Sequence, residues 1–172
     1  SLPASVDNTI QPYFRPLFNQ SGLECGQAAS IGLNFTYEID LARNVAGNIS
    51  QNQYATHFTY NFINGGSDAG VSYFETWEIV KRCGTPTSAE YGGLATGGAS
   101  RWMTGYDKYY NAMHNRISDV YSINAGDENG LNTLKNWIFN HSNTASVGGL
   151  ANIYIQYKTP DAQLAEGTPE AG

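Results

Sequence analysis

The chain has 172 residues, of which 14% are charged, and 9 basic against 15 acidic residues give it a formal net charge of −6. The basic residues never gather into a stripe that could neutralise a phosphate backbone, so we expect no nucleic-acid partner. No apolar run approaches the roughly 18 residues that a membrane span needs, so we expect no membrane partner either. A composition rich in Gly, Asn, Ser, Thr and Tyr favours a secreted or extracytoplasmic protein.

The chain is predicted to begin with an extended arm and a long buried helix. Residues 1–20 carry several prolines and no sustained period, which is typical of an arm on the surface. From Gly26 the apolar residues recur at helical spacing, and this predicts a buried helix over 26–44. Cys25 stands directly before this helix and could pair only with Cys83. If Cys25 is reactive, the two should stay unpaired.

Two shorter helices are predicted next. The stretch 54–64 has a helical pattern that stops at Gly65 and Gly66. Another helix follows, with Asp68 as its expected cap and Gly84 at its end.

The second half of the chain mixes predicted strands with one helix. The pattern predicts a strand at 119–124, a helix at 126–141 and a buried strand with a glycine interruption at 145–157. A glycine-rich stretch at 91–100 precedes them and marks a boundary between lobes.

This order of elements predicts an α+β protein of two lobes. Residues 1–105 are expected to form an N-terminal arm plus a helical lobe, and residues 106–172 the first part of a β-rich lobe. One or two strands cannot close a sheet, so the second lobe is expected to be incomplete, with an open edge.

Cys25 is the candidate for chemistry. A helix N-terminus offers unpaired N–H groups and the positive end of the helix dipole, and both stabilise a thiolate. Gln20 can bring a side-chain amide to the same place, as a neutral donor for an oxyanion. The alternative is that Cys25 packs as a small apolar residue, as free cysteines often do. No residues show metal-ligand spacing or a phosphate loop, so we expect neither a metal nor a cofactor.

The order of several short motifs resembles that of the papain-like cysteine peptidases. The motifs "LPASVD" (2–7), "RPLFNQ" (15–20) and "CGQAASIG" (25–32) follow the family's order of arm, "NQ" stretch and nucleophile helix. Further on, "INGG" (63–66) is similar to the family's substrate loop. The predicted strand, helix and strand after residue 118 are similar to those that precede the family's histidine. The chain thus resembles the N-terminal part of a bacterial, secreted member.

The resemblance implies a papain-like two-lobe fold and a cysteine endopeptidase. Cys25 would be the nucleophile that forms a thioester acyl-enzyme with a peptide or protein substrate, and Gln20 would be the oxyanion-hole side chain. Asn64, Gly65 and Gly66 would form an edge that pairs with an extended substrate backbone, because glycines allow a close approach.

The chain departs from the family at several positions. Gly26 stands where the family typically has an aromatic residue, and the spacing from Gln20 to Cys25 is one residue shorter than the common pattern. Residues 21–24 and Ile63 lack the two cysteines that the family joins by a bridge. Both cysteines of the family's disulfide bridge are therefore absent.

A papain-like enzyme also needs a histidine to share a proton with the thiol and an asparagine to orient it. The chain has only His57, His114 and His141, and none lies at the family's position, roughly 130 or more residues after the cysteine. We therefore expect a second chain, the C-terminal fragment of the same precursor, to supply the histidine and the asparagine and to complete the β-rich lobe.

The residues leave other functions open. The acyl group could pass to a nucleophile other than water. The chain could also be a non-catalytic binding module of papain-like shape, with Tyr, Asn and Gly as a recognition surface, or an extracellular structural domain with Cys25 buried.

Overall fold

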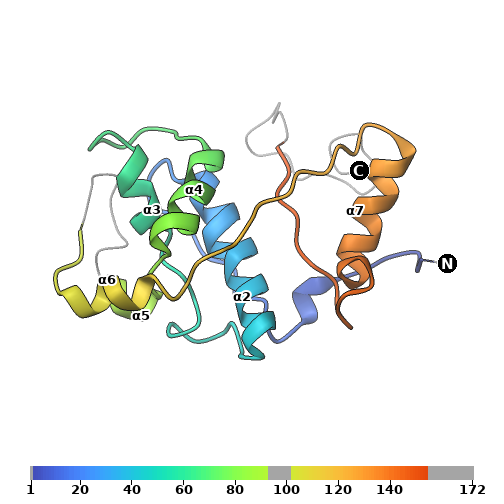
Figure 1. The fold of residues 1–172 in the computed structure, drawn as a ribbon, viewed down its shortest axis with the longest axis horizontal. Coiled ribbons are helices and arrows are strands. Elements are labelled where there is room, and N and C mark those ends of the chain that lie inside the picture. The colour runs from blue at the N-terminus through green and yellow to red at the C-terminus, as the bar shows by residue number, and fades with distance from the viewer. Residues whose placement is uncertain (1, 93–101, 155–172) are drawn as a thin grey trace.

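A computed structural model of the chain describes residues 2–92 and 102–154, which are largely helical (Figure 1). Its helices are η1 (Asn8–Ile10), α1 (Cys25–Gln27), η2 (Ala28–Phe35), α2 (Thr36–Arg43), α3 (Thr56–Ile63), α4 (Tyr73–Cys83), α5 (Ser88–Tyr91), α6 (Tyr106–Ala112), α7 (Glu128–Asn140) and η4 (His141–Asn143). Helices α3 to α6 lie at one end of the molecule and α7 at the other, with α2 between them. None of these helices is both long and apolar enough to cross a bilayer.

The predicted long helix is confirmed as one continuous helical run from Cys25 to Arg43, made of α1, η2 and α2. It ends at Asn44, which takes the left-handed conformation with φ of 53°. The middle segment, η2, is a π-helix, and the hydroxyl of Thr36, the first residue after it, donates to the carbonyl of Ile31 at 3.0 Å. The wider turn shifts the side chains that precede it relative to those that follow.

The long run packs against α4 through an apolar core. Its buried members are Ile31, Phe35, Tyr54 and Val80, with Ile39, Trp77 and Ile117 partly buried around them. Burying side chains of this size contributes roughly 1.5–3 kcal/mol each. A second cluster, made of Ala55, Phe58, Tyr91, Met103 and Tyr109, joins α3 to α5 and α6.

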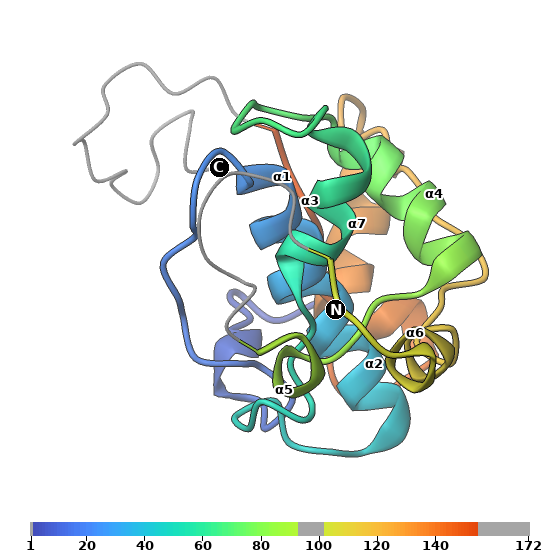
Figure 2. The same cartoon turned by 90° about the vertical axis from the view of Figure 1, so that its left-hand side faces the viewer.

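Helix α3 confirms the helix predicted at 54–64, and Gly65 and Gly66 follow it with φ of 63° and 80°. Figure 2 shows α3 between α1 and α4. The cap predicted for α4 is wrong: the hydroxyl of Ser72, not the carboxylate of Asp68, accepts from the N–H of Phe74. Gly84 ends α4 as predicted, with φ of 71°.

The predicted α+β class, with its incomplete β-rich lobe, is contradicted. Residues 2–92 and 102–154 contain no strand, and an isolated bridge between Tyr54 and Thr87 is the only strand-like pairing in them. The segments 119–124 and 145–154 run without ladder partners, and Ile153 is 69% exposed rather than buried. An apolar run becomes a strand only when a neighbour takes up its N–H and C=O groups. Residues 155–157 of the second predicted strand lie outside the described ranges.

Side chains from helices take up the backbone of the segment 148–150 instead. Tyr37 donates its hydroxyl to the carbonyl of Gly148 at 2.7 Å. The N–H of Leu150 donates to Glu38 Oε1 at 3.0 Å, and Trp137 Nε1 donates to the carbonyl of Leu150 at 2.8 Å. These contacts fix the segment between α2 and α7 without a sheet.

The helix predicted at 126–141 is confirmed as α7, with the carboxylate of Asp127 accepting from the N–H of Gly130 at 2.8 Å as its N-cap. No residue of α7 is fully buried, and Leu131 and Phe139 are 40% and 37% exposed. The glycine-rich stretch expected between the lobes falls mostly in 93–101, outside the described ranges. The division at residue 105 stays a prediction.

Candidate functional site

Cys25 is the first residue of the long helical run, and its side chain is exposed. It opens into a pocket of about 220 Å³, lined by Leu17, Phe18, Gln20, Cys25, Ala28, Ala29 and Leu33. Cys25, Ala29 and Leu33 follow one another at helical spacing along one face of the run, and residues of the arm form the other wall. The thiol therefore lies at the end of a mainly apolar groove. The alternative of a buried cysteine is excluded.

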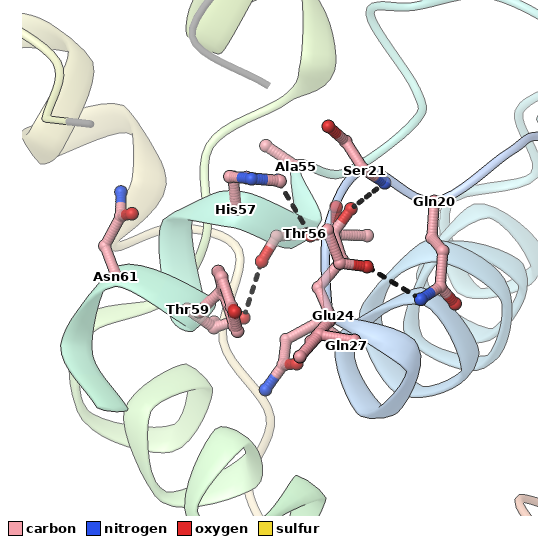
Figure 3. A network of polar contacts seen from close by, with 12 residues as sticks. Gln20, Ser21, Glu24, Gln27, Ala55, Thr56, His57, Thr59 and Asn61 are labelled. Carbon is pink, nitrogen blue, oxygen red and sulfur yellow. Dashed lines mark hydrogen bonds and ion pairs between the residues drawn. The ribbon is translucent and has the colours of Figure 1, made fainter. Parts of the chain in front are cut away.

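Gln20, labelled in Figure 3, lines the same pocket. Its Nε2 donates to the carbonyl of Gly22 at 2.9 Å. A side-chain amide has two N–H groups, so one remains for another acceptor. Cys25 and Gln20 are thus the predicted site residues that the structure brings together.

Directly before the nucleophile lies a buried contact between a carboxyl group and an imidazole that the sequence analysis did not find. Glu24 and His57 are 2% and 0% exposed, and Glu24 Oε2 lies 2.8 Å from His57 Nδ1. Glu24 Oε1 accepts from the N–H of Ser21 at 3.1 Å (Figure 3). The acidic residue next to the cysteine can be seen in the sequence, but no local sequence pattern indicates that it contacts a histidine on α3.

Asn64, Gly65 and Gly66 form the turn after α3. Asn64 is buried, and its Oδ1 accepts from the N–H of Gly66 at 2.9 Å, which closes the turn. No atom lies within 4 Å of an ideal Cβ at Gly65 or Gly66, so this backbone is open to an approaching chain. None of the three lines the pocket at Cys25. Their role in substrate binding stays a prediction.

None of the three histidines is among the described residues that line this pocket. Each of them contacts other groups. His57 lies against Glu24. His114 is exposed, with Nδ1 3.0 Å from the carbonyl of Tyr110. His141 is buried, with its ring nitrogens 2.8 Å from Glu38 Oε2 and 2.7 Å from the carbonyl of Val147.

The environment of His141 shifts its protonation. Burial on its own lowers the pKa, but the hydrogen bonds to Glu38 and to the carbonyl of Val147 outweigh burial and raise the pKa above its ordinary value of 6.5. His141 is therefore protonated more readily than a free imidazole, and its contact with Glu38 helps to hold α7 against α2.

Cys83, at the end of α4, is half-buried and unpaired. Within 2–92 and 102–154, no three side chains of His, Cys, Asp or Glu gather closely enough to hold a metal ion.

No protein-family model matches the chain, and no curated protein matches it. Among solved structures, the chain is similar to xylellain, a cysteine protease from Xylella fastidiosa. The two are 17% identical, with a TM-score of 0.49, over 69% of this chain and 48% of the other. The chain therefore spans about half the length of xylellain.

Proposed function

We propose that this chain is the nucleophile-bearing part of a cysteine-type peptidase, which hydrolyses peptide bonds through a thioester acyl-enzyme. The observation that carries the proposal is the exposed thiol of Cys25, which shares its pocket with the amide of Gln20. A nucleophile must be accessible, and a hydrogen-bond donor close to it can bind the charge that develops on the attacked carbonyl.

The roles follow from these positions. Cys25 Sγ attacks the carbonyl carbon, and the carbonyl oxygen becomes an oxyanion that accepts hydrogen bonds from Gln20 Nε2 and from the backbone N–H of Cys25. Collapse of this intermediate breaks the C–N bond, releases the amine and leaves a thioester on Cys25. Water then attacks the thioester, which releases the acid and restores the thiol. The open backbone of Gly65 and Gly66 is the proposed edge for an extended substrate.

The reaction needs a base that takes the thiol proton and later protonates the amine. We propose that a second polypeptide, from the same precursor, brings this histidine and its asparagine to the pocket at Cys25. The apolar wall of the pocket supports this, because Leu17 is 80% exposed in the described part of the chain. A large apolar side chain this exposed at a pocket suits a face that another polypeptide covers.

Selective labelling tests the nucleophile. Iodoacetamide should alkylate Cys25 at least ~10-fold faster than half-buried Cys83. In material purified with its natural partner chain, Cys25→Ser should abolish peptide hydrolysis, and the control Cys83→Ser should keep it. Equal labelling of the two cysteines, or hydrolysis by the Cys25→Ser variant, would contradict the proposal.

The intact mass of the active material tests the second chain. We expect an additional polypeptide that stays associated and contains a histidine. Full hydrolysis by material that contains this chain alone would show that the base comes from the chain itself.

A second candidate function is a non-catalytic module that binds extended peptides. It is favoured by the lack of a histidine among the described residues that line the pocket. The two functions differ in one result: the module binds a peptide without cleaving it, and its Cys25→Ser variant binds equally well.

A further inference from the structure

The loop that leads into the nucleophile, residues 20–24, is held to the rest of the chain at two points. Glu24, at its end, contacts His57 on α3. The N–H of Leu23 donates to Asp68 Oδ1 at 2.7 Å, across 45 residues of sequence. Asp68 belongs to the turn after Gly65 and Gly66, so this hydrogen bond joins the nucleophile loop to the proposed substrate edge.

Asp68 is itself oriented by α3. The hydroxyl of Tyr60, a fully buried side chain, lies 2.9 Å from both Asp68 Oδ1 and the carbonyl oxygen of Ala69, and its one hydrogen is shared between these two acceptors. The Leu23 N–H and the Tyr60 hydroxyl, in that order, lower the pKa of Asp68 below its ordinary value of 3.8. The carboxylate therefore stays ionised, and a charged acceptor makes the stronger kind of hydrogen bond.

Gly22 shows how closely the loop approaches Asp68. An ideal Cβ at Gly22 would lie 2.6 Å from Asp68 Oδ1, and the φ of Gly22 is 78°. A larger residue here would be strained by the positive φ and would push the Asp68 carboxylate aside. The loop is thus built around the carboxylate.

We propose that Asp68 is a positioning residue, whose carboxylate holds the Leu23 backbone and so fixes Gln20 and Cys25 relative to each other. This inference rests on the proposed function, because it concerns the same nucleophile and the same oxyanion donor. Asp68 provides a non-covalent tie between the two places, residues 21–24 and the region of Ile63, where the chain lacks a cysteine pair. Asp68 is not among the described residues that line the pocket at Cys25.

The expected effect of losing this tie is mispositioning. An oxyanion donor contributes only when it is held in place before the reaction, and a displacement of about 1 Å can cost on the order of 10²-fold in rate. The pocket and the helix that carries Cys25 would remain, so substrate binding should change less than turnover.

Three variants test the proposal in the full chain with its partner polypeptide. Asp68→Ala removes the acceptor, and Asp68→Asn keeps a neutral oxygen in its place. Asp7→Ala is the matched control, because Asp7 is also an exposed carboxylate that accepts a backbone N–H, from Thr9 at 2.9 Å. Hydrogen exchange at the Leu23 amide and the kcat and KM for a peptide are measured for each variant.

We expect Asp68→Ala to raise Leu23 exchange at least ~10-fold and to lower kcat roughly 10- to 100-fold, with KM little changed. Asp68→Asn should restore most of the protection of the Leu23 amide and most of kcat. Asp7→Ala should resemble the wild type in both measurements. Unchanged Leu23 exchange in Asp68→Ala overturns the inference, whatever the activity. Faster exchange of the Leu23 amide with unchanged kcat also overturns the inference, because the hydrogen bond to Asp68 then does not position Gln20 and Cys25 for the reaction. A wild type that hydrolyses no peptide refutes the proposed function, and the exchange data still decide whether Asp68 holds the loop.

Discussion

Asp40 on α2 makes the stability of the chain depend on pH. Its side chain is fully buried, and neither carboxylate oxygen has a hydrogen-bond partner among the described residues. Burial raises its pKa from 3.8 to about 7, although the nearby positive charge of Arg43 acts in the opposite direction. The folded state therefore keeps the Asp40 proton over a range of pH in which the unfolded chain has lost it.

The sign of the effect follows from proton linkage. Stability falls with pH wherever the folded state binds more protons than the unfolded state, so Asp40 reduces the free energy of unfolding as the pH rises from 3.8 to about 7. One pH unit corresponds to about 1.4 kcal/mol, which gives a total loss on the order of 4 kcal/mol over this interval. The loss levels off above pH 7, where both states are ionised.

Asp40→Asn should remove this loss, because the amide has a similar shape and no charge to gain. The free energy of unfolding of both proteins is measured by urea unfolding at several values from about pH 4 to about pH 8. The remaining titrating groups are common to both, so the difference between the curves isolates Asp40. A control, Asp7→Asn, should parallel the wild type in this range, because hydrogen bonds from Thr9 lower the pKa of Asp7 below 3.8. If Asp40→Asn also parallels the wild type, Asp40 is ionised in the folded state and the reasoning is wrong.

Two further predictions concern stability. The pair of His141 and Glu38 raises the pKa of His141, so its stabilisation is complete below about pH 6.5 and is lost as the pH rises through the raised value. Glu38→Gln should remove most of this loss above about pH 6.5 in urea unfolding, and a variant with the same loss as the wild type would contradict the assignment. Gly84→Ala should cost roughly 2–5 kcal/mol, because Gly84 has φ of 71° and an added Cβ would collide with the carbonyl of Ala112. Its control, Gly65→Ala, has a similar φ but open space around it, so it should cost only about 1 kcal/mol; equal losses in the two variants would show that the collision is relieved.

The sequence predicts the long run, α3, α4 and α7 because each has its signal within a few residues, but it does not predict the short helices α5 and α6. Apolar residues at helical spacing predict a helix over 26–44, which the structure has as the run from Cys25 to Arg43, and glycines mark the ends of α3 and α4. The predicted cap of α4 is wrong because Asp68 and Ser72 are both residue types that can cap a helix. Ser72 takes the cap, and Asp68 accepts from Leu23 N–H instead. A pattern can state which residues are able to cap, but not which distant donors compete for them.

The two wrong strands have a related physical cause. An extended apolar run satisfies its backbone with whatever donors and acceptors the folded chain brings to it, and a neighbouring strand is only one such source. For the segment 148–150 the sources are Tyr37, Glu38 and Trp137, all on helices that precede it in the chain. Each of these side chains also looks like an ordinary helix residue in the sequence. The same limit applies at the candidate site: Cys25 and Gln20 are five residues apart and could be paired from the sequence, whereas Glu24 and His57 meet only because α3 packs beside α1.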